Sequence, residues 1–432
     1  MSLLSPPLTG EPQLPIAPGV GGLIASVNVY SENSPEGFLM LRKVIYLVTL
    51  ALLFAGLGFA QGNFVYTNDD IGGPNSVSGF SVASDGSLTL IPGSPFLTRG
   101  TGVSGFGYYA TQRVTATTVG NFVFASNTAS NDVSVFTVDT NTGALTLVPG
   151  SPFPVGGSPG GFGIALGVTP NNQFLIAANG GTVTVFSIAG DGTLTPIAGS
   201  PFPLLAESFG IAVSPDGRFL ALGEGPTGQP VEFQVEMMSI DSDGSLASIG
   251  GFPTTGDAVA TGVAINCASD LLYLAEANFG RTIVDGYSIS TTGSLTPVPG
   301  SPFENSLGQN SNVVLLDRIH GARDKLLFVS NQDSDTIESF KLAKGGSLSL
   351  VGAFPMHSSF RPAGMATNAD GNLLYVANSN NVVSVFSVEA NGRMKGTLTE
   401  VAGSPFASGQ NGDLLSLTSF PPNVCKVGRK PK

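Results

Sequence analysis

The sequence has few of the residues that most often carry catalysis or bind metal ions. Its 432 residues include two histidines, two cysteines and no tryptophan. No Cys/His cluster has the spacing of a zinc site, and the run Asn331–Asp335 lacks the glycine and the downstream glutamate of a calcium loop. We therefore expect no metal and no cofactor.

Positive charge is scarce as well. Lys and Arg total 18 against 30 Asp and Glu, which gives a formal net charge of −12. Such a protein repels the phosphates of nucleic acids and of anionic membranes, so we expect neither as a partner. The basic residues between Lys426 and Lys432 are interpreted as part of a solvated tail over residues 421–432.

The first 60 residues differ from the rest of the chain. Residues 1–39 contain no Lys or Arg and no clear periodicity, so we predict an unstructured N-terminal extension. Residues 40–60 have a short basic start, an apolar run and small residues at the end, which is typical of a signal peptide cleaved after Ala60. Met40 is then the expected true start, and the mature protein is secreted, periplasmic or on the cell surface, without membrane attachment. The alternative is an uncleaved anchor.

A repeated phrase dominates the remaining sequence. The stretch Val183–Phe202, VTVFSIAGDGTLTPIAGSPF, recurs with changes from Val77, Val133, Met237, Val284, Ile337 and Val383. A period of about 50 residues built only from strand and turn signals predicts a propeller. The 58 glycines and 30 prolines fit the many tight turns that such a fold requires.

Each repeat contains four strand signals, so we predict an all-β, seven-bladed β-propeller of four-stranded antiparallel blades over residues 61–420. A YVAN-like phrase, a VSVFSV-like phrase, an outer strand ending at Ser-Pro-Phe and a Gly-Ile-Ala-like phrase follow one another. One strand signal, Asp413–Phe420, is left over after the last repeat. We predict that it pairs into the first blade as the innermost strand and closes the ring.

These phrases resemble a known family. The stretches SNDVSVFTVDTNTGALTLVPGSPF from Ser130 and SPDGRFLALGEG from Ser214 are similar to the seven-bladed lactonase-like propellers, which include 6-phosphogluconolactonase-type and muconate-cyclising proteins. They are also similar to the YVTN-repeat propellers of bacterial surface proteins. The resemblance covers residues 63–420. It implies either a scaffold that binds a ligand or a protein, or a lactone hydrolase or cycloisomerase.

The sequence departs from the lactonase pattern at one place. Lactonase-type relatives commonly carry His, with Arg and Glu nearby, where the innermost strand enters the central channel. Here that position is glycine in four blades and Arg113 in the second blade; the glycines are Gly163, Gly210, Gly262 and Gly364. Neither His320 nor His357 matches the pattern. Whether the protein is an enzyme therefore stays open.

The candidate site residues are those at which the repeats disagree. The YVAN-like phrase ends in Asn in five blades, where the Asn is expected to cap a turn, but in Glu224 and Glu276 in the other two. We interpret these glutamates as candidate catalytic bases at one mouth of the channel. Candidate binding residues on the same face are Arg113, Arg281, Arg361, Glu207 and His357. The alternative is that all of these are solvated loop charges.

The partner is therefore predicted to be a small ligand or a protein bound at the channel mouth of a monomer. We favour a binding scaffold over lactone chemistry, because the expected histidine is missing. Cys267 is expected to end an inner strand, whereas Cys425 lies in the tail. The two should lie on different blades, which disfavours a disulfide without excluding it.

Overall fold

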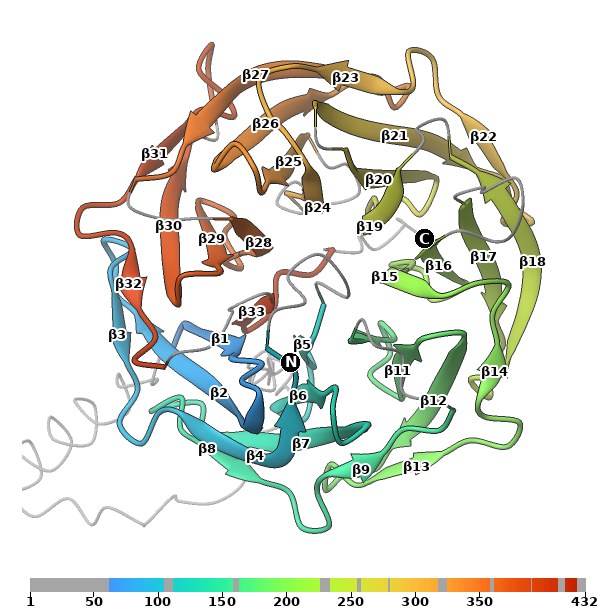
Figure 1. Ribbon diagram of the computed structural model, residues 1–432, viewed down its shortest axis with the longest axis vertical. Helices are drawn as coiled ribbons and strands as arrows, with labels where there is room; N and C mark the ends of the chain where they lie inside the picture. Colours follow the sequence, from blue (N-terminus) through green and yellow to red (C-terminus); the bar gives the residue numbers. More distant parts are fainter. Residues whose placement is uncertain are drawn as a thin grey trace, which may run out of the picture. The chain divides into compact units, whose positions relative to one another are not determined.

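Seven antiparallel sheets surround a central channel in the computed structural model (Figure 1). The structure describes residues 62–104, 112–157, 163–225, 234–254, 258–278, 280–317, 325–357, 361–389, 391–410 and 416–425. The predicted extension and signal peptide lie outside these ranges. In the described part of the chain no helix is long and apolar enough to cross a membrane.

The strands follow the predicted order within each blade. Blade 1 holds β1 (Phe64–Asn68), β2 (Gly73–Val82), β3 (Leu88–Leu90), β4 (Phe96–Gly102) and β33 (Ser416–Phe420); blade 2 holds β5 (Val114–Ala116), β6 (Phe122–Asn127), β7 (Asp132–Val138), β8 (Leu145–Leu147) and β9 (Phe153–Pro154). Blade 3 holds β10 (Ile164–Val168), β11 (Phe174–Asn179), β12 (Thr182–Ile188), β13 (Leu194–Pro196) and β14 (Phe202–Pro203).

The remaining blades repeat this plan. Blade 4 holds β15 (Ser208–Val213), β16 (Phe219–Glu224), β17 (Gln234–Ile240) and β18 (Leu246–Pro253); blade 5 holds β19 (Val259–Ile265), β20 (Leu271–Ala277), β21 (Thr282–Ile289), β22 (Leu295–Pro297) and β23 (Phe303–Asn305). Blade 6 holds β24 (Ser311–Leu316), β25 (Leu326–Asn331), β26 (Thr336–Leu342) and β27 (Leu348–Pro355); blade 7 holds β28 (Pro362–Thr367), β29 (Leu373–Asn378), β30 (Val382–Val388), β31 (Leu398–Glu400) and β32 (Phe406–Ala407).

The ring closes through the C-terminal strand, as predicted. β33 pairs antiparallel with β1, with Phe64 opposite Phe420 and Asn68 opposite Ser416. Blade 1 therefore combines one strand from the end of the chain with strands from its beginning. This pairing covers an edge of β1 that would otherwise lie open in the channel.

The repeated phrase forms the outer half of each blade. In blade 3 it supplies β12 and the two short segments β13 and β14, separated around Ser200-Pro201. Blades 4 and 6 have Gly251 and Ala353 in place of this proline, and there the outer strand runs unbroken with a β-bulge. Proline cannot donate to a strand ladder, which explains where the outer strand breaks.

The core lies between neighbouring blades. Leu220 and Leu222 of β16 pack against Ile176 and Val183 of blade 3, and comparable clusters of buried apolar side chains fill the other spaces between blades. Both faces of every sheet are therefore covered, so the strands read as apolar runs.

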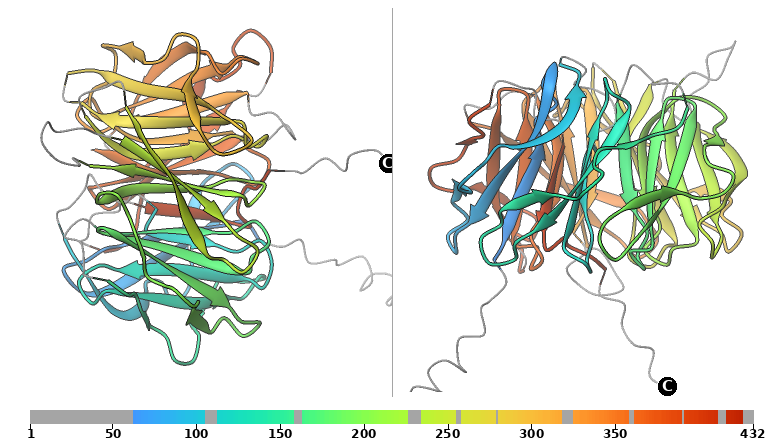
Figure 2. Two further views of the ribbon diagram at one scale, coloured as in Figure 1. Left: turned by 90° about the vertical axis from the view of Figure 1, so that its right-hand side faces the viewer. Right: turned by 90° about the horizontal axis from the view of Figure 1, so that it is seen from below.

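The channel has two ends, which we name by the loops around them. At the crossover face each inner strand begins, as β10 does at Ile164 opposite Asn179. At the turn face the inner strand ends, as β10 does at Val168 opposite Leu175. Figure 2 shows the blades edge-on between these two faces.

The two cysteines form a disulfide, contrary to the expectation from the sequence. Cys267 follows β19 in blade 5, and its Cα lies 5.3 Å from that of Cys425. The blade assignment was correct, but residues 421–425 cross from blade 1 to the opposite side of the turn face. Asn423 marks this path, because its Nδ2 donates to the Thr367 hydroxyl (2.6 Å) and to the Asp317 carbonyl (3.2 Å).

Candidate functional site

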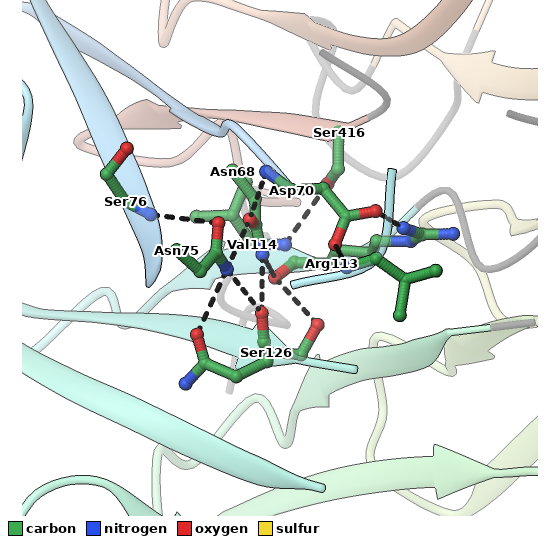
Figure 3. Close-up of polar contacts among 10 residues, drawn as sticks. Asn68, Asp70, Asn75, Ser76, Arg113, Val114, Ser126 and Ser416 are labelled. Atoms are coloured by element: carbon green, nitrogen blue, oxygen red, sulfur yellow. Dashed lines mark hydrogen bonds and ion pairs between the residues drawn. The ribbon is translucent and has the colours of Figure 1, made fainter. Parts of the chain in front are cut away.

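Arg113 lies at the crossover face, immediately before β5. Its guanidinium donates to the carboxylate of Asp70, which lies just beyond β1, and both side chains are buried (Figure 3). Asp70 has a left-handed backbone (φ 44°), and its own N–H donates to Asn68 Oδ1 at 3.1 Å. A charge removed from water in this way requires a partner, and Asp70 supplies it.

A hydrogen-bonded network surrounds this ion pair. Asn68 Nδ2 donates to the carbonyl oxygens of Arg113 (3.1 Å) and Ser126 (2.8 Å), and Asn75 Nδ2 donates to Asn68 Oδ1 (3.0 Å). The N–H of Val114 donates to the hydroxyl of Ser416 (3.1 Å). The network joins blade 1, blade 2 and the C-terminal strand at the place where the ring closes. Arg113 thus stabilises ring closure.

The glycines at the crossover face have a steric reason. A Cβ on Gly210 would lie 2.2 Å from the Thr261 carbonyl oxygen, and one on Gly262 would lie 2.7 Å from the Asn312 carbonyl oxygen. Inner strands of neighbouring blades therefore approach too closely for a side chain at these points. At these positions the chain brings two backbones together.

The strand register also corrects the sequence alignment of blade 3. Gly210 lies opposite Gly223, and the equivalent position opposite Ala178 is Ala165, not Gly163. Gly163 lies two residues earlier, with a φ of 107°, and a Cβ there would lie 2.9 Å from the Arg113 guanidinium. The glycine at position 163 therefore leaves space for the Arg113 side chain, and it does not occupy the position of a site residue.

Glu224 is buried at the end of β16 and faces blade 3, on the same side of the strand as Leu222. Its carboxylate accepts hydrogen bonds from Gln234 Nε2 (2.6 Å) and from the N–H of Ala206 (3.3 Å). Burial, together with a hydrogen bond and the charge of Glu236, raises the pKa of Glu224 to about 8. Glu236 accepts from the N–H of Leu205 at 2.9 Å. The two carboxyls together hold the crossover from blade 3 to blade 4.

Glu276 is also fully buried, at the end of β20. It lies two residues beyond Leu274, which packs against blade 4, so Glu276 is on the same side of the strand. Asp285, opposite Leu274 on β21, accepts a hydrogen bond from the Tyr287 hydroxyl at 3.0 Å. Both predicted catalytic glutamates therefore occupy spaces between blades.

The sequence reasoning missed a set of buried acids on the third strand of blades 4, 5 and 6. Glu236, Asp285 and Glu338 occupy one repeat position, at which the other blades have a hydroxyl; those residues are Ser78, Ser134, Thr184 and Ser384. Glu338 accepts from the Thr282 hydroxyl and from Asn305 Nδ2, both at 3.0 Å. A comparison of this position across the repeats would have found them.

The other predicted binding residues are spread over the molecule. Arg281 pairs with Glu304 of β23 (2.9 Å) and His357 with Glu400 of β31 (2.7 Å), so both lie against outer strands and not at the channel mouth. Glu207 and Arg361 are exposed and immediately precede the inner strands β15 and β28. They therefore lie at the crossover face, where the inner strands begin.

Two acids of the run Asn331–Asp335 contact the residues that precede the inner strands β24 and β28. Asp333 accepts from Asn310 Nδ2 (3.2 Å) and lies 3.9 Å from Arg361 Nη2, while Asp335 accepts from the Arg361 N–H (2.7 Å). Within the described ranges no group of three or more His, Cys, Asp or Glu side chains is placed to hold a metal ion. These acids link blade 6 to blade 7.

Comparison with known proteins shows which family part of the chain resembles. The family model described as Lactonase, 7-bladed beta-propeller, matches residues 316–408. Over these residues the match confirms the resemblance seen in the repeats, and the seven four-stranded blades make the chain a seven-bladed β-propeller. None of the curated proteins matches the chain.

Solved structures share the whole ring. A candidate 6-phosphogluconolactonase from Bacteroides fragilis is 18% identical with a TM-score of 0.61, over 84% of this chain and 99% of that one. A second, from Bacteroides uniformis, is 17% identical with a TM-score of 0.63, over 83% and 99%. The periplasmic gluconolactonase of Pseudomonas aeruginosa is 17% identical with a TM-score of 0.60, over 80% and 97%. At these identities the likeness establishes the fold alone.

Proposed function

We propose that the mature chain is an exported scaffold that binds a small polar ligand or a protein at the crossover-face mouth, without hydrolysing lactones. The observation that carries this proposal is the position of the two glutamates. Glu224 and Glu276 are buried between blades, and Glu224 accepts hydrogen bonds from Gln234 and Ala206. A general base must reach its substrate, which these positions do not favour.

Glu207 and Arg361 are the residues best placed to contact a partner. Both are exposed at the crossover-face mouth, on blades 4 and 7, and they carry opposite charges. The 3.9 Å separation between Arg361 and Asp333 is long for an ion pair, and Arg361 is half exposed. An anionic group of a ligand can therefore reach this guanidinium from solvent.

A lactone hydrolase or cycloisomerase is the second candidate. The names of the solved structures from Bacteroides and Pseudomonas support it. The raised pKa of Glu224 supports it too, because a carboxyl with a pKa of about 8 keeps a proton at neutral pH and can act as a general acid. This reaction would require blades 3 and 4 to open at the Leu204–Ser208 crossover.

One experiment separates the two candidates. Residues 61–432 are screened for thermal stabilisation by sugar acids and sugars, and for hydrolysis of a panel of lactones. The scaffold predicts binding of an anionic ligand that Arg361→Ala abolishes and Arg281→Ala leaves unchanged, since both arginines are about half exposed in surface pairs. Lactone turnover that is lost in Glu224→Gln or Glu276→Gln establishes the enzyme instead. If the protein shows neither ligand binding nor lactone turnover, both candidate functions are contradicted.

Export is supported by the disulfide. A bond between Cys267 and Cys425 persists in oxidising compartments such as the periplasm and is rare in the cytosol. N-terminal sequencing of the native protein is expected to start at Gln61, and thiol labelling of the native protein is expected to fail without a reductant. Peptides from residues 1–39 in the native precursor, or freely labelled cysteines, contradict this assignment.

A further inference from the structure

The turn-face half of the channel is hollow. Two cavities of about 370 and 220 Å³ lie along it, and they share wall residues, so they adjoin. Six of the seven inner strands each contribute an apolar side chain to both cavities; these are Val114, Val168, Val213, Leu315, Met365 and Leu417. The larger cavity falls within the range of roughly 300–1,000 Å³ that is typical of small-molecule sites.

The walls carry no charge. Among the described residues that line either cavity, none is Asp, Glu, Lys, Arg or His, although the chain has 30 acidic and 18 basic residues. One polar side chain, Gln112, reaches both cavities, and its buried Oε1 has no hydrogen-bond partner among the residues that the structure describes. A buried acceptor without a partner favours a ligand that brings a donor.

The C-terminal segment forms part of the floor. Pro422, Asn423, Val424 and Cys425 line the larger cavity at the turn face. This segment is fixed at one end by β33 in blade 1 and at the other by the disulfide to Cys267 of blade 5, with the Asn423 hydrogen bonds between them. The floor is therefore a fixed wall of the cavity.

We propose that this cavity is a binding site for an uncharged, mainly aliphatic small molecule with one hydroxyl or amide donor. The apolar side chains shared by both cavities favour the aliphatic part, and the donor satisfies Gln112 Oε1. The larger cavity also carries uncharged polar side chains, such as Thr169, Thr367 and Asn423. A carboxylate or a phosphate would be buried there without a counter-charge, which is costly. The site is separate from the crossover-face mouth proposed above and does not depend on that function.

The test uses an uncharged fluorescent dye, N-phenyl-1-naphthylamine, and its displacement from residues 61–432. The absence of tryptophan keeps the protein's own fluorescence low. We expect 1-octanol to displace the dye at least tenfold more effectively than octanoate, which has the same chain length and a charge. We also expect 1-octanol, but not octanoate, to raise the melting temperature of the unmodified protein.

Variants locate the site. Leu315→Asp places a charge in the cavity and Val213→Phe fills it, and each is expected to weaken binding of the dye at least tenfold. Leu90→Asp is the matched control, because Leu90 lies on the outer strand β3 and is 38% exposed. Gln112→Leu is expected to reduce the preference for 1-octanol over its methyl ether by about two- to tenfold, the value of one hydrogen bond.

Several results would overturn the proposal. They are absence of dye binding, equal binding in Leu315→Asp, Val213→Phe and Leu90→Asp, or equal competition by octanoate and 1-octanol. If neither cavity variant folds, the comparison of melting temperatures in the unmodified protein decides, and an equal shift with both ligands rejects the site.

Discussion

The two ends of the channel are built from the same inner strands but have opposite chemistry. At the crossover face, buried polar groups such as Asp70, Arg113 and Glu224 bond to one another or to the backbone. At the turn face, apolar side chains such as Val213 and Leu315 surround empty volume. The first end uses its hydrogen bonds to hold blades together, whereas the second leaves space that no side chain fills.

This difference shows that unusual residues in a repeat protein can mark the places where the ring is joined. Arg113 replaces a glycine in one blade because that blade lies next to the closure of the ring. Glu224 replaces an asparagine where a crossover must be held. Residues that differ from the repeat should therefore be tested for a structural role first, beginning with the change expected to destabilise the ring most.

Removing the C-terminal strand is expected to have the largest effect. Deletion of residues 413–432 removes the buried side chains of Leu417 and Phe420, the Ser416 hydrogen bond and the disulfide. We expect a loss of at least about 5 kcal/mol of unfolding free energy, from the two large side chains alone. Deletion of residues 426–432 is the control and should change little. Unchanged thermal unfolding of the longer deletion would contradict closure by β33.

Breaking the buried ion pair is expected to rank second. Arg113→Met leaves the Asp70 carboxylate buried without its partner, which should cost about 3–5 kcal/mol in urea unfolding. Arg281→Ala, in an exposed pair with Glu304, should cost less than about 1 kcal/mol. The double variant Arg113→Met/Asp70→Asn should recover part of the loss. Equal effects of the two arginines would remove the distinction between closure and surface pairs.

The sequence predicted the fold well because the repeats record strand order directly. Seven copies of one phrase indicated the number of blades, and the leftover strand Asp413–Phe420 indicated the closure. The site was predicted less well, because a pattern of strands does not show where a strand stops or which way its last side chain points. Glu224 was predicted to end its strand, as it does in β16, and to open onto the channel mouth, but its side chain faces blade 3.

Contacts between blades could not be predicted from the repeat pattern. The Asp70–Arg113 pair joins residues 43 apart, and the disulfide joins residues 158 apart through a segment that no repeat contains. Neither separation has a periodic signal. Only the path of residues 421–425 over the turn face brings Cys425 to Cys267.

Loss of the disulfide is expected to rank third and to act on the turn-face end alone. Cys425→Ser should lower the unfolding free energy by about 2–4 kcal/mol, mainly because the unfolded chain is no longer constrained. It should also loosen the floor of the cavity and weaken binding of N-phenyl-1-naphthylamine. Ligand binding at Arg361 on the crossover face should not change. A loss at both faces would show that the two ends are coupled.

The smallest effect concerns pH and tests the buried acids of the crossover-face end. Burial raises the pKa of Asp69 from 3.8 to about 6, and burial with Glu236 raises that of Glu224 from 4.5 to about 8. Each carboxyl binds its proton more tightly in the folded state than in the unfolded state. Its contribution is therefore complete below the unfolded pKa and is lost as the pH rises through the folded pKa.

Stability should accordingly fall between about pH 4 and pH 8. Glu224→Gln keeps a hydrogen-bonding side chain but cannot ionise, so its stability should depend less on pH between about 5 and 8. Asp243→Asn, in an exposed turn, is the control: Ser245 hydrogen bonds lower the pKa of Asp243, so the variant should leave the profile between about pH 5 and 8 unchanged. Urea unfolding at each pH measures the effect. A profile identical in the unmodified protein and Glu224→Gln would mean that Glu224 is charged at neutral pH, and the buried carboxyls would then not distinguish the two ends.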